Sequence, residues 1–304
     1  MKKKTKMEYH NPVLLKESVD GLNIKPDGVY VDVTFGGGGH SREILSRLNE
    51  HGKLLAFDQD EDAKRNMIDD ERFTLIPQNF RFIKRYLRFY GVKKVDGVLA
   101  DLGVSSHQFD EAERGFSTRF DADLDMRMNQ ADELSAFQVI NFYDEEKLSD
   151  VLFQYGELRN ARAIAKKIVE ARSEKKIKTS FELKEVLSEF VPKAVEHKIL
   201  AQIFQGIRIE VNQEIEALKE FLLQVPEILN KDGRLSVISY HSLEDRLVKR
   251  FIINGLFEGE PEKDFYGNID VPLKKVGKMI VPSFQEIKIN NRARSAKLRI
   301  GTLK

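Results

Sequence analysis

Residues 30–40 read Tyr-Val-Asp-Val-Thr-Phe-Gly-Gly-Gly-Gly-His and join two different periodicities. The first six are β-branched and aromatic for the most part, which is typical of a buried strand. After the four glycines, residues 41–48 carry apolar side chains at helical spacing. A strand that enters a helix through a glycine turn is the first unit of a parallel α/β sheet with right-handed crossovers.

The same alternation continues along the chain and is interrupted once. We expect further strands at 53–57, 73–76, 95–102, 234–240, 284–289 and 296–300, and helices at 61–68, 81–90 and 242–253. Between the fourth and fifth strands every strong pattern is helical, at 136–142, 145–153, 160–172, 181–190 and 197–205, followed by a long helix at 212–229 that bends near Pro226.

These patterns predict an α/β fold, a Rossmann-like sheet with an inserted all-helical domain. The sheet domain is expected to be discontinuous, over residues 1–130 and 207–304, and the helical insertion to span 131–206.

Composition excludes several classes of protein. The chain has 304 residues, of which 33% are charged and 41% hydrophobic, and it contains no cysteine. A thiolate nucleophile, a disulfide, a cysteine-ligated zinc and an iron–sulfur cluster are therefore excluded. No apolar run approaches the ~20 residues that span a bilayer, and residues 1–6 lack the apolar stretch of a signal peptide. We expect a cytoplasmic protein with no membrane partner.

The net charge of +1 conceals an uneven distribution. Residues 270–304 hold nine Lys and Arg against two acids, and residues 1–6 hold four Lys, so the body between them is acidic. We interpret the N-terminal lysines as a solvated tail. In the C-terminal stretch the charges alternate with apolar residues, which favours a phosphate-binding surface.

The glycine turn and the strand ends predict a ligand site. The turn is not the dinucleotide fingerprint, because Ser41 stands where the third glycine is required. Four glycines exceed what a tight turn needs and favour close approach of a ligand. Asp58, at the end of the second strand, can accept ribose hydroxyls or be a solvated turn carboxylate. Phe80 can flank an adenine or pack in the core.

Further candidates follow the fourth and fifth strands. In an open parallel sheet ligands bind at the carboxyl ends of the strands, so Asp101 is expected in the same crevice as Asp58. Tyr240 and His241 are the candidates for contact with a base, and the residues after them suit the first turn of a helix.

An acidic segment resembles a calcium loop only at its start. Asp121, Asp123 and Asp125 have the spacing, but Met126 and Asp132 occupy the sixth and twelfth positions. We expect no metal there, and an acidic loop that forms ion pairs instead. The expected basic partners are Arg114, Arg119 and Arg127.

Eight segments in order resemble the bacterial 16S rRNA (cytosine-N4)-methyltransferase family of MraW type, and together they cover essentially the whole chain. They are residues 10–15, 36–40, 101–106, 113–117, 124–128, 204–212, 240–246 and 291–299.

The resemblance implies a methyltransferase sheet, S-adenosyl-L-methionine as cofactor, and a cytidine in the decoding (P-site) region of 16S rRNA as substrate. The partner is then 16S rRNA or the assembled small ribosomal subunit; the sequence leaves these two open, as it does a homodimer. Carried over residue by residue, the cofactor contacts are Gly38, Gly39, His40, Asp58, Phe80, Asp101 and Gln108.

Methylation of cytosine N4 needs no covalent intermediate, which fits a chain without cysteine. The nitrogen is a weak nucleophile that must be oriented, and a carboxylate can accept its protons. Asp101, Tyr240 and His241 are the candidate catalytic residues. Asp101 either orients the amine or binds the amino-acid part of the cofactor, and Tyr240 or His241 stacks on the base. The candidate phosphate ligands are Arg292, Arg294, Lys297 and Arg299.

Two other functions share some of these features. A nicotinamide-dependent dehydrogenase has the same strand, glycine turn and acid, but the broken fingerprint disfavours it. A non-catalytic ribosome-assembly factor would explain the basic C-terminal stretch and leaves the glycine turn and Asp58 without a purpose.

Overall fold

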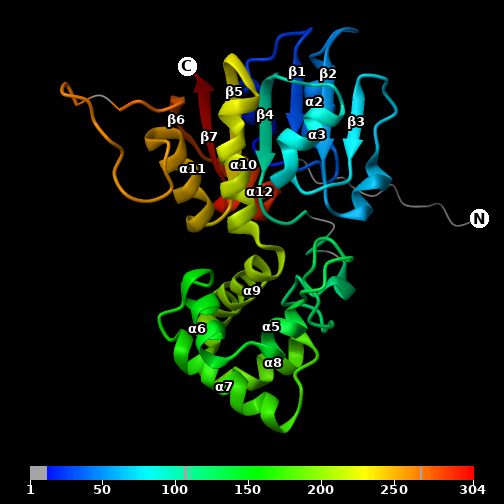
Figure 1. Cartoon of the computed structure of the whole chain (residues 1–304). Coiled ribbons are helices and arrows are strands. Elements are labelled where there is room, and N and C mark those ends of the chain that lie inside the picture. The colour runs from blue at the N-terminus through cyan, green and yellow to red at the C-terminus, as the bar shows by residue number, and fades with distance from the viewer. Residues whose placement is uncertain (1–11, 106–107, 110, 268) are drawn as a thin grey trace, which may run out of the picture. The chain divides into compact units, whose positions relative to one another are not determined.

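The computed structural model describes residues 12–105, 108–109, 111–267 and 269–304. The chain divides into two compact units, which we call the sheet unit (residues up to 103 and from 216 onward) and the helical unit (residues 104–215) (Figure 1). Three residues of the family-like segments, His10, Asn11 and Ser106, lie outside the described residues, as does the lysine-rich start of the chain.

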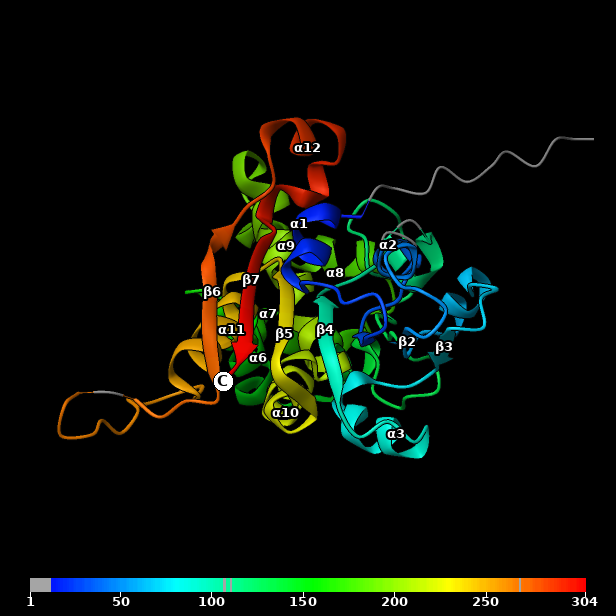
Figure 2. The same cartoon turned by 90° about the horizontal axis from the view of Figure 1, so that it is seen from above.

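The sheet unit contains one seven-stranded sheet in the order β3-β2-β1-β4-β5-β7-β6 (Figure 2). Strands β1 to β5 are parallel where they pair, and β7 is antiparallel to both of its neighbours. The strands are β1 (Val29–Asp32), β2 (Lys53–Phe57), β3 (Phe73–Ile76), β4 (Val95–Asp101), β5 (Leu229–Ser239), β6 (Leu273–Ile280) and β7 (Lys297–Leu303). The α/β class and the first five strands are confirmed.

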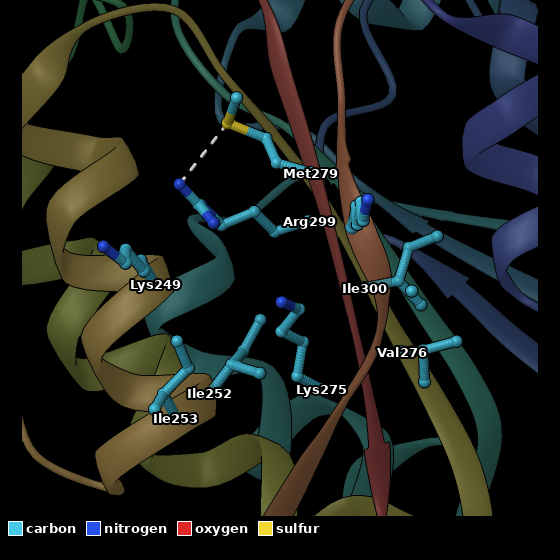
Figure 3. A pocket seen from close by; sticks show the side chains of 10 residues that line it. Lys249, Ile252, Ile253, Lys275, Val276, Met279, Arg299 and Ile300 are labelled. Atoms are coloured by element: carbon cyan, nitrogen blue, oxygen red, sulfur yellow. Dashed lines mark hydrogen bonds between the residues drawn. The ribbon is translucent and has the colours of Figure 1, made fainter.

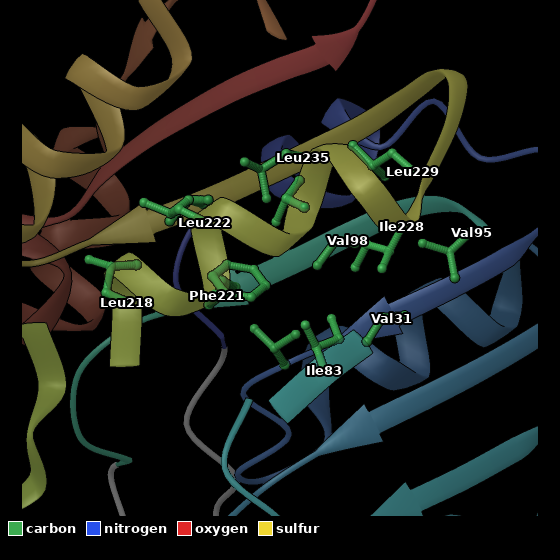
Figure 4. Close-up of a cluster of buried hydrophobic side chains, with 14 of the residues drawn as sticks. Val31, Ile83, Val95, Val98, Leu218, Phe221, Leu222, Ile228, Leu229 and Leu235 are labelled. Carbon is green, nitrogen blue, oxygen red and sulfur yellow. The ribbon is translucent and has the colours of Figure 1, made fainter. Parts of the chain in front are cut away.

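Alternating side chains give the sheet two buried faces. Val31 and Phe57 belong to one apolar cluster, whereas Tyr30 and Leu54 belong to another. Helices α3, α10 and α11 pack on the first face, with Phe221 of α10 at its centre, and α1 and α2 pack on the second (Figure 4). The helices of this unit are α1 (Leu15–Gly21), α2 (Gly39–Ser46), α3 (Ile83–Phe89), α10 (Glu214–Ile228, which begins in the helical unit), α11 (Ser242–Asn254) and α12 (Phe284–Ile289).

In the C-terminal stretch the strand expected at 296–300 is confirmed as β7, one prediction is wrong and one strand was not expected. Residues 284–289 were expected as a strand and form helix α12, because Ser283 caps it by accepting a hydrogen bond from Glu286 N at 3.1 Å. The strand that completes the sheet is β6, which sequence analysis missed. Its lysine-rich sequence LKKVGKMI lacks the apolar alternation of a half-buried strand, since β6 lies at the edge of the sheet.

The helical unit is larger than the insertion expected at 131–206. Phe116, Leu124 and Met126 are buried in its core, so the aperiodic segment before residue 131 belongs to it. Asn212 ties that segment to α9: its side chain accepts from Met128 N at 2.7 Å and donates to Met126 O at 2.8 Å. The helices are α5 (Ala136–Phe142), α6 (Glu145–Gln154), α7 (Ala161–Glu174), α8 (Ser180–Val186) and α9 (Glu196–Asn212).

Smaller differences have local causes. The long helix expected at 212–229 is preceded by a break at Gln213, whose φ of 49° is left-handed and separates α9 from α10. The helix expected at 61–68 is a 3₁₀-helix, Glu61–Asn66. The other 3₁₀-helices are Phe80–Phe82, Ala112–Arg114, Ser188–Phe190, Lys193–Val195 and Asn291–Ser295.

In the described part of the chain, no helix has both the length and the apolar character that crossing a bilayer requires.

Candidate active site

The carboxyl ends of β1, β2, β4 and β5 meet at one edge of the sheet, because these strands are parallel and adjacent in register. Thr34 joins two of these ends: its Oγ1 accepts a hydrogen bond from Asp101 N at 2.6 Å. Asp58 follows β2, and Tyr240 follows β5. The candidate residues Asp58, Asp101 and Tyr240 therefore lie along a common edge, as the topology argument predicted.

The glycine turn is tightly packed by the protein itself. Gly38 has a left-handed φ of +74°, and a Cβ there would lie 2.9 Å from the ring of Phe35. A Cβ on Gly39 would lie 2.1 Å from the ring of Pro12. Packing thus accounts for these two glycines, so the structural explanation of the turn is stronger than sequence analysis allowed. Approach of a ligand is an additional reason that stays a prediction.

Asp58 closes the turn from the neighbouring strand. Its carboxylate accepts hydrogen bonds from Gly36 N at 2.7 Å and from Asp60 N at 2.9 Å. Burial raises the pKa of Asp58 to about 6, and the two N–H donors only partly offset this effect. A carboxylate has about four lone-pair positions, so this side chain retains acceptors for two hydroxyl groups.

Asp32 is the buried support of the site. It has no exposed surface, and it accepts hydrogen bonds from Ser41 Oγ at 2.7 Å and from Thr34 N at 3.1 Å. Burial raises its pKa. These contacts fix the first turn of α2 and the position of Thr34, which in turn holds the backbone of Asp101.

Asp101 and Tyr240 form a hydrogen-bonded side-chain pair at this edge. Tyr240 donates its phenolic O–H to Asp101 Oδ1 at 2.7 Å, and His40 Nδ1 lies 3.8 Å from Asp101 Oδ2. Burial raises the pKa of Asp101 to about 6. Burial and the adjacent carboxylate raise the pKa of Tyr240 well above its ordinary value, which keeps the phenol protonated as a donor.

His241 begins helix α11 as its N-cap. Its Nδ1 accepts from Glu244 N at 3.5 Å, and its Nε2 lies 3.1 Å from Glu244 Oε1. Glu244 is buried and also accepts from Tyr240 N at 2.9 Å. The capping residue is thus His241, and a structural role for this histidine is established beside the expected contact with a base.

The remaining cofactor candidates are less closely grouped. His40 is buried in the first turn of α2, with Nε2 at 3.2 Å from Val13 O. Phe80 is half-buried and packs edge-to-face on Phe221, with ring centroids 5.4 Å apart, so its role in the core is established. Gln108 belongs to the helical unit, where it is buried and its Oε1 accepts from Ser105 N at 2.9 Å.

The four basic candidates divide into two pairs. Arg299 and Lys297 on β7 both contact Asp245 of α11, with Arg299 Nε at 2.6 Å and Lys297 Nζ at 3.3 Å. Arg292 and Arg294 lie in the 3₁₀-helix before β7, and Arg294 is exposed. The β7 cations therefore hold α11 against the sheet, which a sequence pattern of alternating charge does not indicate.

In the acidic segment of the helical unit, Arg127 pairs with Asp125 at 2.7 Å, as expected. Arg114 donates to the backbone carbonyls of Arg127 and Met128.

Three supporting residues were not expected at the site: Asp32, Thr34 and Glu244. Asp32 could have been identified because it is a charged residue within an otherwise apolar strand. For Glu244 the signal was its position three residues after the N-cap, which is the spacing of a capping box.

This arrangement of carboxylates suits a positively charged small molecule that is bound next to a nucleobase. Asp32, Asp58 and Asp101 converge on one edge, and the charge of Asp32 contributes to the raised pKa of both Asp58 and Asp101, so the edge favours a cationic ligand. Asp58 has acceptors for vicinal hydroxyls, and Asp101 has an acceptor for an amine.

The chain is similar to known proteins over nearly its whole length. The model of the MraW methylase family matches residues 7–303. The chain is 70% identical over 296 residues to ribosomal RNA small subunit methyltransferase H of Flavobacterium johnsoniae, covering 97% of this chain and 98% of that protein. It is 55% identical to the protein of that name from Bacteroides thetaiotaomicron, covering 99% of each. An rRNA methylase structure from Streptococcus thermophilus aligns with a TM-score of 0.43 and 12% identity, over 98% of this chain and 99% of that one.

Proposed function

The chain belongs to the MraW methylase family and is a methyltransferase of small-subunit ribosomal RNA, and from this we propose that it methylates the exocyclic N4 of a cytidine in the P-site region of 16S rRNA. The observation that carries the proposal is the Asp101–Tyr240 pair at the carboxyl edge of the sheet. The pair presents a fixed acceptor beside a protonated phenol, without any thiolate in the chain.

S-adenosyl-L-methionine supplies the methyl group when it is bound. The residues present fit it: the carboxylate of Asp58 has free acceptors for the ribose hydroxyls, and the acidic edge complements a sulfonium and an ammonium group. Gly38 and Gly39 keep side chains away from the start of α2, and Phe80 offers one face of a half-buried ring to the adenine.

Asp101 orients the target amine in this proposal. Its Oδ1 is held by Tyr240, and its Oδ2 lies 3.8 Å from His40 Nδ1. A carboxylate that accepts a proton of the amino group from one side favours the nucleophilic form of the nitrogen and then receives the proton released on methylation. Since the pKa of Asp101 is about 6, the carboxylate is ionised at neutral pH. It is also a stronger base than an ordinary aspartate, which makes it a better proton acceptor.

The RNA contacts of the proposal are distributed over both units. Arg292 and Arg294 are the phosphate ligands in the sheet unit, and Lys297 and Arg299 add positive charge there while they hold Asp245. The helical unit recognises the RNA around the target base. His241 supports the position of Tyr240 through Glu244, and the ring of His241 or Tyr240 stacks on the flipped cytosine.

A methyl-transfer assay tests the proposal. The protein is incubated with isotopically labelled S-adenosyl-L-methionine and either transcribed 16S rRNA or assembled small subunits that lack the modification, and the RNA is digested to nucleosides. We expect label in N4-methylcytidine from at least one substrate. Label in 5-methylcytidine or in a ribose-methylated nucleoside would refute the N4 assignment. Absence of label from both substrates would favour the assembly factor.

A further inference from the structure

A narrow basic groove lies in the sheet unit between α11, β6 and β7, away from the strand ends that carry Asp58 and Asp101 (Figure 3). Helix α11 contributes Lys249 and Ile253 to it, and the edge strand β6 contributes Lys275, Lys278 and Met279. Figure 3 shows the side chain of Lys275 in the space between helix and sheet, and Lys249 on α11 at the margin of the groove. Sequence analysis missed β6, so this groove was not expected.

The lining of the groove contains four cationic side chains and no carboxylate. One of them, Arg299, is already paired with Asp245 at 2.6 Å. Lys249, Lys275 and Lys278 are exposed, and within the described part of the chain none of them makes an ion pair or a hydrogen bond with its side chain. Three uncompensated positive charges facing one groove favour an anionic ligand.

Protection of a sheet edge explains only part of this arrangement. Lysines on an edge strand discourage pairing with other strands, which is a sufficient reason for Lys275 and Lys278. It gives no reason for Lys249 on the facing helix, nor for the half-exposed Ile253 and Met279 beside it. A positively charged groove is one way in which proteins follow a nucleic-acid backbone.

The size of the groove distinguishes between anionic ligands. The enclosed space within it has a volume of about 10 Å³. Pockets for small molecules and cofactors measure about 300–1,000 Å³, so a nucleotide enclosed in the groove is a poor fit. An extended chain that lays its phosphates along the groove needs no enclosed volume and uses all three lysines.

We propose that Lys249, Lys275 and Lys278 form a phosphate-binding groove for the rRNA substrate, separate from the site of methyl transfer. This inference rests on the proposed function, because it assigns a second contact surface to the same RNA. The groove supplies affinity and not chemistry, so its loss weakens RNA binding without changing the cofactor site.

The test compares two triple variants of the full-length protein. In the first, Lys249, Lys275 and Lys278 are replaced by Ala. In the control, Lys53, Lys93 and Lys231 are replaced by Ala. The control lysines are also exposed and unpaired among the described residues, and they lie near the amino ends of β2, β4 and β5, opposite the edge that carries the site.

Affinity for transcribed 16S rRNA is measured against salt concentration. Each phosphate contact adds about 0.7–0.9 to the slope of log affinity against log salt, so the groove variant should lose about 2 to 3 from that slope and bind about tenfold or more weakly at low salt. The control should keep the slope of the wild type. Both variants should bind S-adenosyl-L-methionine as the wild type does, which verifies that they are folded.

The proposal that the groove binds RNA would be overturned if the salt slope of the groove variant were unchanged. An equal loss of slope in the control variant would also overturn it. The nucleoside produced by the wild type is identified in parallel. If no N4-methylcytidine forms, the proposed function fails, and the comparison of slopes still decides whether the groove binds RNA.

Discussion

At the scale of single residues, Asp101 connects the fold to the chemistry. Burial raises its pKa to about 6, so the protonated form is favoured and the acceptor is lost as pH falls through that value. We predict that kcat/KM for RNA, measured at saturating cofactor, rises with an apparent pKa near 6, and that at pH 5 about one tenth of the activity remains. Saturating cofactor is required because Asp58 titrates in the same range. A rate that is constant between pH 5 and pH 7 would contradict this role of Asp101.

Asp58 is predicted to bind the cofactor in addition to holding the glycine turn. Asp58→Ala removes the acceptors for the ribose hydroxyls and should weaken binding of S-adenosyl-L-methionine by about tenfold or more, equivalent to about 1–3 kcal/mol for hydrogen bonds to a charged group. Titration calorimetry measures the affinity, and circular dichroism verifies the fold. The ribose role is wrong if the affinity does not change.

Sequence reasoning found Asp58 and Asp101 because both follow directly after strands of a parallel sheet. It did not find how they are held. The hydrogen bond from Tyr240 to Asp101 joins residues that are 139 positions apart, and the contact of Thr34 with Asp101 spans 67. Such contacts depend on strand order, which periodicity alone does not determine.

At the scale of elements, the glycine turn is explained by packing between β1 and α2. We predict that Gly39→Ala destabilises the sheet unit by about 1–3 kcal/mol, because the new Cβ would lie 2.1 Å from Pro12 and the neighbours must move. Gly301→Ala is the control, since a Cβ there meets Ile252 at an ordinary distance of 3.4 Å. Thermal unfolding of the two variants measures the difference, and equal midpoints would refute the packing explanation.

The link between α11 and β7 gives a prediction that depends on pH. Arg299 and Lys297 lower the pKa of Asp245, so this carboxylate stabilises the fold above its unfolded pKa, and the contribution is lost as pH falls through the lowered value. Asp245→Asn should cost about 1–3 kcal/mol of unfolding free energy at pH 7. The cost should shrink towards pH 3. A cost that does not depend on pH would exclude the ion pair as its cause.

The two elements that were not predicted correctly, β6 and α12, have a pattern of polar and apolar residues that does not match their place in the fold. The edge strand β6 carries three lysines because only one of its sides pairs within the sheet, and the alternation that identifies a half-buried strand is absent. In α12, the apolar residues Phe284 and Ile289 led to the prediction of a strand. Both are exposed, with 82% and 76% of their surfaces accessible. The cap at Ser283 determines the structure there.

At the scale of the whole molecule, the sequence predicted a discontinuous sheet interrupted by helices, and this organisation is confirmed. The first segment of the sheet unit ends at residue 103, which is 27 residues before the predicted end at 130. Residues 104–130 have no periodicity by which to assign them to a domain. Their few apolar side chains, such as Leu124 and Met126, are buried in the core of the helical unit. Membership of a core is a property of the folded chain, and an aperiodic segment does not reveal it.

The central claim is that Asp101 orients the amino group of the target cytidine. The most direct measurement is the single-turnover rate of N4-methylcytidine formation by Asp101→Asn, together with its affinity for S-adenosyl-L-methionine. The amide keeps the size of the side chain and loses the ionised acceptor. We predict that the rate falls about 100-fold or more, as expected for loss of general-base assistance, while cofactor affinity changes less than tenfold. An unchanged rate, or a loss of cofactor affinity that accounts for the whole effect, would contradict the claim.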